Sequence, residues 1–126
     1  MTIIVDTSVL IDHLRGEARA RDALSQSAAA GERLAASVLT KVEVLAGMRA
    51  DEEAATRELL RSLHWIAVDD AIAERAGLLA RAYLRSHPGV DPVDYVIAAT
   101  AEQFQAQLWT PNVKHFPMFA DLTSPY

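Results

Sequence analysis

The stretch Thr2-Ile3-Ile4-Val5-Asp6-Thr7-Ser8 determines how the rest of the chain can be arranged. Its three consecutive β-branched residues, bounded by polar ones, are typical of a fully buried strand in a parallel sheet. Asp6 follows directly at the carboxyl end of that strand. In open α/β sheets ligands bind at this edge, because strand ends and the starts of the following helices converge there on a crevice. Asp6 is therefore the first candidate for a functional residue.

Length and composition limit what kind of protein this can be. The chain has 126 residues, 51% of them hydrophobic and 23% charged, as expected of one globular domain spanning 1–126. Without cysteine it has neither a disulfide framework nor a thiolate metal site. The first residues lack the basic leader of a secretory signal, and no stretch approaches the roughly 18 apolar residues of a membrane helix. We therefore expect a cytoplasmic protein that does not associate with membranes.

The net charge of −5 bears on nucleic acid as a partner. It argues against a protein that coats nucleic acid by neutralising phosphates. It leaves room for one that handles nucleic acid at a small acidic site, because bound cations reverse the local charge there.

Patterns of helix and strand alternate along the rest of the chain. Strands are predicted over 33–36, 65–68 and 107–110, with a fifth at 120–122, and helices over 8–14, 17–30, 38–48, 51–62, 70–86 and from 92 onward. Thr7 or Ser8 is available to cap the first helix, Ser37 caps the helix over 38–48, and Asp91-Pro92 is the clearest helix start. This order predicts α/β layers around a mostly parallel sheet.

The helix over 38–48 combines two faces. Its predicted apolar stripe consists of Val38, Val42, Leu45 and Met48. Thr40, Glu43 and Gly47 fall together on an adjacent face.

Four polar residues are candidates for one common site. Asp6 ends the first strand, Glu43 projects from the helix after the second, Asp94 lies in the first turn of a late helix, and Asn112 follows the fourth strand. Each has an ordinary explanation as a cap, a solvated helix residue or a turn residue. Brought together, however, the carboxylates repel and need a compensating cation. Hard oxygen ligands without cysteine point to magnesium or manganese rather than zinc.

Four sequence blocks in order resemble PIN-domain ribonucleases and, among them, the VapC-type toxins of bacterial toxin–antitoxin pairs. The blocks are Ile4-Val5-Asp6-Thr7-Ser8-Val9-Leu10-Ile11, 37–47 (SVLTKVEVLAG), 94–101 (DYVIAATA) and 110–116 (TPNVKHF). The resemblance implies an α/β/α sandwich with a central four- or five-stranded, mostly parallel sheet. It also implies an endoribonuclease that uses Mg²⁺, with Mn²⁺ able to substitute.

The resemblance assigns roles residue by residue. Asp6, Glu43 and Asp94 match the family's acidic positions, and Asn112 falls where some members carry a further Asp. Ser8 and Thr110 match small polar positions that support the metal shell. Asp6 and Asp94 are then metal ligands, directly or through water, and Glu43 is either a ligand or the group that orients the attacking water. Asn112 holds a water without adding charge.

Partners follow from the same resemblance. A VapC-like toxin implies an RNA substrate and a small VapB-like antitoxin that has a DNA-binding part and wraps the toxin. Homodimers and higher toxin–antitoxin complexes are common in the family. The helices over 38–48 and 51–62 either offer a groove for an amphipathic partner helix or are ordinary core.

Other interpretations remain open. A phosphotransfer enzyme also places an Asp after its first strand, but the dehalogenase-like phosphatases want a second Asp where this chain has Ser8. A catalytically silent PIN-like module that binds RNA or a protein partner is the other alternative, suggested by Asn112. His115 is interpreted as a packing and turn residue, Asp91 as a cap, and Asp12 and Glu17 as solvated.

Overall fold

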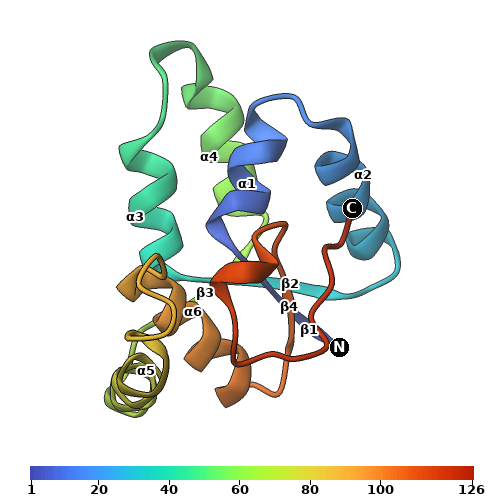
Figure 1. Cartoon of the computed structure of the whole chain (residues 1–126). Coiled ribbons are helices and arrows are strands. Elements are labelled where there is room, and N and C mark those ends of the chain that lie inside the picture. The colour runs from blue at the N-terminus through green and yellow to red at the C-terminus, as the bar shows by residue number, and fades with distance from the viewer.

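Four short strands lie side by side in the order β3-β2-β1-β4, and every neighbouring pair is parallel. This computed structural model describes residues 1–126 (Figure 1). The strands are β1 (Thr2–Val5), β2 (Arg33–Ser37), β3 (His64–Ile66) and β4 (Gln107–Trp109). The helices are α1 (Thr7–Leu14), α2 (Ala18–Ala29), α3 (Val38–Ala46), α4 (Glu53–Arg61), α5 (Asp70–Tyr83) and α6 (Pro92–Gln103), with 3₁₀ turns η1 (Ala50–Glu52) and η2 (Val113–His115).

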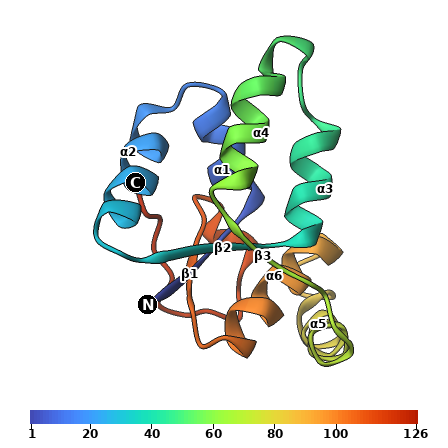
Figure 2. The same cartoon turned by 180° about the vertical axis from the view of Figure 1, so that it is seen from behind.

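The side chains of β1 alternate between two cores. Ile3 and Val5 belong to a cluster with residues of α1, α2, α3 and α4, whereas Ile4 belongs to a cluster with α5 and α6. Figures 1 and 2 show these two groups of helices on opposite sides of the sheet. Because successive side chains of a strand point to opposite faces, a strand buried on both faces must be apolar throughout. The predicted α/β/α sandwich is confirmed, with four strands.

Most of the predicted helix starts are confirmed. The side chain of Ser37 accepts a hydrogen bond from Leu39 N, that of Asp69 from Ile72 N, and that of Asp91 from Val93 N. The prediction for α1 was wrong. Asp6, not Thr7 or Ser8, occupies its N-cap position, and no side chain caps that helix.

Two further predictions were wrong. Residues 120 and 121 form a turn and Leu122 lies outside any regular element, so no fifth strand forms; Leu122 packs against the core cluster of α5 and α6 instead of joining the sheet edge. On α3, which ends at Ala46, Val42 is 61% exposed, while Thr40 and Val44 are buried. Of the predicted apolar stripe, Leu45 packs against the core, but the prediction for Val42 was wrong because a polar residue, Thr40, takes the inward position.

None of the helices combines the length and the apolar character that crossing a membrane requires.

Candidate active site

Asp6 is fixed by the pairing of the two central strands. Val5 lies opposite Trp109, so the residues that follow, Asp6 and Thr110, stand side by side. Thr110 Oγ1 donates to Asp6 Oδ2 at 2.7 Å, and Ser8 Oγ donates to the same oxygen at 2.6 Å. Asp6 is only 4% exposed. The two hydroxyls occupy Oδ2, which leaves Oδ1 without a hydrogen-bond partner from the chain.

Thr110 also connects Asp6 to the following loop. Its Oγ1 accepts from the backbone N–H of Asn112 at 3.0 Å, so the hydroxyl proton is free to point at Asp6. Thr110 is fully buried. One threonine thus sets the orientation of the carboxylate and of the loop that carries Asn112.

Glu43 reaches the same region from the side, on α3. Thr7 Oγ1 donates to Glu43 Oε1 at 2.6 Å. Thr7 Oγ1 also lies 3.0 Å from Oγ1 of the fully buried Thr40. Because a hydroxyl has a single proton, Thr7 gives its proton to Glu43 and accepts from Thr40. This chain of hydroxyls holds Glu43 by one oxygen and leaves Oε2 available.

Asp94 lies in the first turn of α6 and closes a capping box with Asp91. Asp91 N donates to Asp94 Oδ2 at 3.2 Å, while Val93 N donates to Asp91 Oδ1 at 2.7 Å. The prediction that Asp91 caps this helix is therefore confirmed. His115 Nδ1 lies 3.3 Å from Asp94 Oδ2. Burial, and then the negative charge of Asp6, raise the pKa of Asp94 to about 6 against the opposing effects of the Asp91 N–H and His115.

One open cavity of about 330 Å³ brings the predicted residues together. Its lining includes Asp6, Ser8, Glu43, Asp94 and Asn112, joined by Thr7, Ile11, Asp12, Asp91 and His115. Thr110 stands behind Asp6 rather than in the lining. The cavity has a single apolar lining residue and opens at the carboxyl edge of the sheet. Its geometry suits a polar ligand that carries cations, rather than a small apolar molecule.

The family model described as PIN domain matches residues 3–113. The chain belongs to the PIN-domain family.

Relatives over the whole length of this PIN domain are ribonucleases by name. The chain is 48% identical over 123 residues to ribonuclease VapC19 of Mycobacterium tuberculosis, covering 98% of both chains. It is 45% identical over 124 residues to ribonuclease VapC10 of the same organism, covering 98% of this chain and 92% of the relative. Among solved structures, a toxin–antitoxin complex from Klebsiella pneumoniae has a TM-score of 0.80 at 30% identity, with 98% of each chain covered.

A structure at lower identity supports the fold. DNA-bound VapBC from Salmonella typhimurium has a TM-score of 0.78 at 20% identity, over 92% of this chain and 90% of the other. Both the recognition of the family and the fold class are thereby confirmed.

The donor set of this PIN domain fits a hard divalent cation, which PIN-domain ribonucleases generally use. Asp6 Oδ1 and Glu43 Oε2 have no hydrogen-bond partner from the chain, and the negative charge of Asp6 adds to burial in raising the pKa of Asp94. As the side chains stand, no three carboxylate or imidazole groups lie close enough to hold one ion directly. Such a site suits a divalent cation that takes one or two carboxylates and completes its coordination with water.

Sequence reasoning missed three residues of the site. His115 was interpreted as a packing and turn residue, but it lines the cavity beside Asp94. Asp12 was interpreted as solvated, but it is half-buried, lines the cavity and accepts from Tyr126 Oη at 2.5 Å. Thr7 was read only as a cap. A signal was present for Thr7, since Thr40 and Glu43 share a helix face and need a polar neighbour.

Proposed function

We propose that this chain is a divalent-metal-dependent endoribonuclease that acts as the toxin of a toxin–antitoxin pair. In this proposal residues 1–126 form a single PIN-like domain, working in the cytoplasm, that hydrolyses RNA phosphodiester bonds. The observation that carries it is the convergence of Asp6, Glu43, Asp94 and Asn112 on one open polar cavity. These four residues come from four different parts of the chain: the end of β1, α3, the start of α6 and the loop after β4. Local capping alone therefore does not explain why they lie around one cavity.

The proposed ligands are Asp6 and Asp94, with Glu43 acting directly or through water. A divalent cation, Mg²⁺ or in its place Mn²⁺, makes water a usable nucleophile near neutral pH and offsets charge on the phosphate. Asp6 presents Oδ1 while Ser8 and Thr110 hold its other oxygen. Each hydroxyl thereby keeps the carboxylate in one orientation, which lowers the entropy lost on binding.

Glu43 is proposed to orient the attacking water. Thr7 anchors one carboxylate oxygen, so the other has a fixed direction from which to accept a proton. Asn112 is exposed and its side-chain amide has no partner within the chain, so it can both donate to and accept from a water molecule. Because Asn112 is neutral, the site carries one negative charge fewer than a site built from four acidic residues. We therefore propose one tightly held ion, with a second arriving alongside RNA.

The test is cleavage of total cellular RNA by purified, antitoxin-free protein. We expect fragments with MgCl₂ or MnCl₂, none with excess EDTA, and none from Asp6→Asn. Asp121→Asn, which changes an exposed acid outside the cavity, is the matched control and should cleave as the wild type does. Cleavage that persists in EDTA or in Asp6→Asn contradicts the proposal, as does the absence of cleavage on any cellular RNA.

We also propose a VapB-like antitoxin and a homodimer as partners. The antitoxin is supported by the complexes to which the fold is similar. The homodimer follows from the resemblance to VapC-type toxins, and Val42 on α3 and Leu78 on α5 are exposed apolar side chains that we propose it covers. Light scattering of the purified protein tests the dimer, and Val42→Glu with Leu78→Glu should yield a monomer if these side chains form the contact.

A further inference from the structure

Asp12 lines the proposed active-site cavity but belongs to none of the proposed metal ligands. It lies in the last turn of α1, four residues after Ser8, whose hydroxyl holds Asp6. Side chains four residues apart on a helix are neighbours, with about 5–6 Å between their Cβ atoms. Asp12 therefore stands one helical turn away from the proposed metal site, on the same side of α1 as Ser8.

The local structure gives no reason for an acid at this position. The last turn of a helix carries the negative end of the helix dipole, which disfavours a carboxylate there. The cavity also holds the carboxylates of four other residues, namely Asp6, Glu43, Asp91 and Asp94. Like charges gathered in one cavity repel each other. An acid that stands at position 12 despite both costs points to a use inside the cavity.

Tyr126 fixes the orientation of the Asp12 carboxylate. The last residues of the chain lie beside α2 (Figures 1 and 2), and Tyr126 packs against the core cluster of α1 to α4, with Arg19 6.0 Å from the centre of its ring. Tyr126 Oη donates to Asp12 Oδ2 at 2.5 Å. Burial, and then this hydrogen bond, raise the pKa of Tyr126, so the phenol keeps the proton that it donates.

The other oxygen of Asp12 is left for a ligand. Asp12 Oδ1 has no hydrogen-bond partner from the chain. Holding Tyr126 does not by itself require a charge at position 12, because the amide oxygen of an asparagine also accepts from a phenol. A negatively charged acceptor with a fixed direction is suited to a hydrogen-bond donor on the bound molecule, since hydrogen bonds to charged groups are the stronger ones.

The donor that Asp12 meets follows from the chemistry of RNA. A carboxylate repels the phosphates, so it can only face the ribose 2′-hydroxyl or the N–H groups of a base. Bases that proteins recognise are commonly stacked on aromatic side chains, and the cavity lining has no phenylalanine, tyrosine or tryptophan. The ribose, in contrast, is attached directly to the phosphate. A group one helical turn from the metal site is therefore within reach of a neighbouring sugar.

We propose that Asp12 Oδ1 accepts a hydrogen bond from a ribose 2′-hydroxyl of the bound RNA, and that Tyr126 is its positioning residue. The inference rests on the proposed function, because it assigns a binding contact within that site. Hydrolysis in which water attacks the phosphate does not use the 2′-hydroxyl, so the acids of the metal site do not by themselves select RNA. The 2′-hydroxyl is the group by which a protein tells RNA from DNA, and Asp12 reads it.

The experiment compares two pools of randomised 12-nucleotide strands with the same bases. One pool is RNA, and the other is 2′-fluoro-RNA, which has no 2′-hydroxyl to donate. Both carry fluorescein, and their affinities are measured by fluorescence anisotropy in CaCl₂, whose hard cation takes oxygen ligands. Because both pools carry the same phosphates, the ratio of the two affinities is independent of changes in the net charge of the protein.

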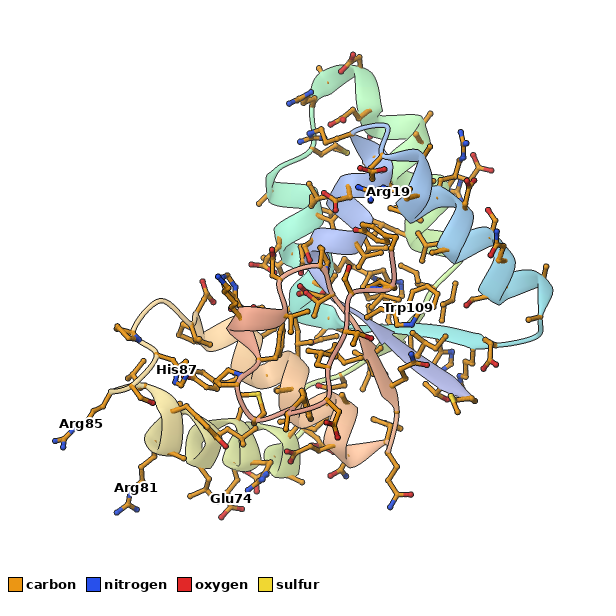
Figure 3. The ribbon with its side chains drawn as sticks, turned by 45° about the vertical axis from the view of Figure 1, so that its right-hand side comes forward. Arg19, Glu74, Arg81, Arg85, His87 and Trp109 are labelled. Atoms are coloured by element: carbon orange, nitrogen blue, oxygen red, sulfur yellow. The ribbon has the colours of Figure 1, made fainter.

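Five proteins are compared by this ratio. They are the wild type, D12A, the isosteric D12N, Y126F and the control E74A. Glu74 of the control is an exposed acid on α5 that points away from the body of the molecule (Figure 3). Y126F keeps the ring that packs on the core and removes only the hydroxyl. Circular dichroism verifies the folding of each variant, and D12N replaces D12A if D12A does not fold.

We expect the wild type to bind RNA about tenfold or more tightly than 2′-fluoro-RNA, as for one hydrogen bond to a charged group. The ratio should fall to about one in D12A and should fall clearly in D12N, whose neutral amide makes a weaker hydrogen bond. Y126F should lower the ratio about threefold, because binding then has to immobilise the freed carboxylate. E74A should match the wild type. D12A should keep its Mn²⁺ affinity within about fivefold.

Several results overturn the proposal. Equal affinity of the wild type for the two pools, or no binding of either, shows that the cavity does not read the sugar. A wild-type ratio in folded D12A or D12N leaves Asp12 as a structural partner of Tyr126, or as a contact of the bases if both affinities fall together. A hundredfold loss of Mn²⁺ affinity in D12A makes Asp12 a metal ligand instead.

Cleavage of total cellular RNA in MgCl₂ separates this inference from the proposed function. If the wild type cleaves no RNA but the affinity ratio falls in D12A as expected, the proposed hydrolysis is wrong and the sugar contact stands. If the wild type cleaves RNA but binds the two pools equally, the proposed function stands and the role of Asp12 is wrong.

Discussion

Asp6 and Asp94 bring the same carboxylate group to one cavity from two different kinds of structure. Asp6 follows a central strand, is 4% exposed, and has one oxygen held by two side-chain hydroxyls. Asp94 lies in a helix start and is held by one backbone N–H at 3.2 Å, with His115 beside it. Its pKa is raised to about 6, mainly by burial. The strand end thus supplies a carboxylate with a fixed orientation, and the helix start supplies one whose charge depends on pH.

The largest expected effect comes from removing either carboxylate. Asp6→Asn and Asp94→Asn should each lower RNA cleavage by more than the roughly 10- to 100-fold that losing a hydrogen-bond partner of a metal ligand costs. Single-turnover rates at saturating MnCl₂ measure this, with Asp121→Asn as the control. If one of the two variants retains wild-type rates, that residue has only a structural role and the two regions do not share a site.

The rigidity of Asp6 is tested by removing its buried hydroxyl partner. Thr110→Val removes the donor to Asp6 Oδ2 and leaves the Asn112 N–H without its acceptor. We expect about 10- to 100-fold weaker Mn²⁺ binding and a loss of about 1–3 kcal/mol in the free energy of unfolding. Calorimetry and urea unfolding measure the two effects. Thr110→Ser keeps the hydroxyl and should restore Mn²⁺ binding; failure to do so would mean that the methyl group, not the hydrogen bond, matters.

The pH dependence separates Asp94 from Asp6. A carboxyl whose pKa is raised in the folded state binds its proton more tightly there than in the unfolded chain. The metal-free protein should therefore lose about 1 kcal/mol of stability as the pH rises from about 4 to above 6, after allowance for partial exposure. Asp94→Asn should abolish that loss, as measured by urea unfolding across this pH range. An unchanged pH profile in the variant contradicts the raised pKa of Asp94.

Mn²⁺ binding should show the opposite trend with pH. A protonated Asp94 is a poor ligand, so Mn²⁺ affinity should weaken as the pH falls below about 6. Calorimetric titrations between pH 5 and pH 8 measure this effect. Affinity that is constant over this range indicates that Asp94 does not contact the ion.

The smallest expected effect concerns Asn112. Asn112→Asp adds a fourth acid at an exposed position, so Mn²⁺ affinity should rise only about fivefold, the equivalent of an exposed ion pair of about 1 kcal/mol. The added charge should also raise the pKa of Asp94 further. Asn112→Ala is the control variant, because its side chain has neither the carboxylate of Asp nor the amide of Asn. A hundredfold gain in Asn112→Asp would instead make this position an equal partner of Asp6.

The parts of the fold and site that sequence predicted are those set by local chemistry. Ile3 to Val5 can be stable only as a strand buried on both faces, which places Asp6 at the strand end. The Asp91-Pro92 start is fixed by a capping box, which places Asp94 in the first turn. The site residues Asp6, Glu43, Asp94 and Asn112 remain a prediction in their chemical roles, although they share a cavity.

The parts that sequence missed depend on contacts between distant segments. Thr40 is buried because Thr7, 33 positions away, provides a hydrogen-bond partner, so hydrophobicity alone chose the wrong face of α3. His115 reaches Asp94 only because η2 follows β4 beside α6, an arrangement no local pattern encodes. For the same reason the segment 120–122 was mistaken for a strand.

The most direct test of a shared metal site is a calorimetric titration of MnCl₂ into metal-free wild type, Asp6→Asn and Asp94→Asn at pH 7.5. We predict one saturable high-affinity site in the wild type and its loss in both variants, with folding verified by circular dichroism. A folded Asp6→Asn protein that binds Mn²⁺ as tightly as the wild type does would contradict the central role given to the strand end.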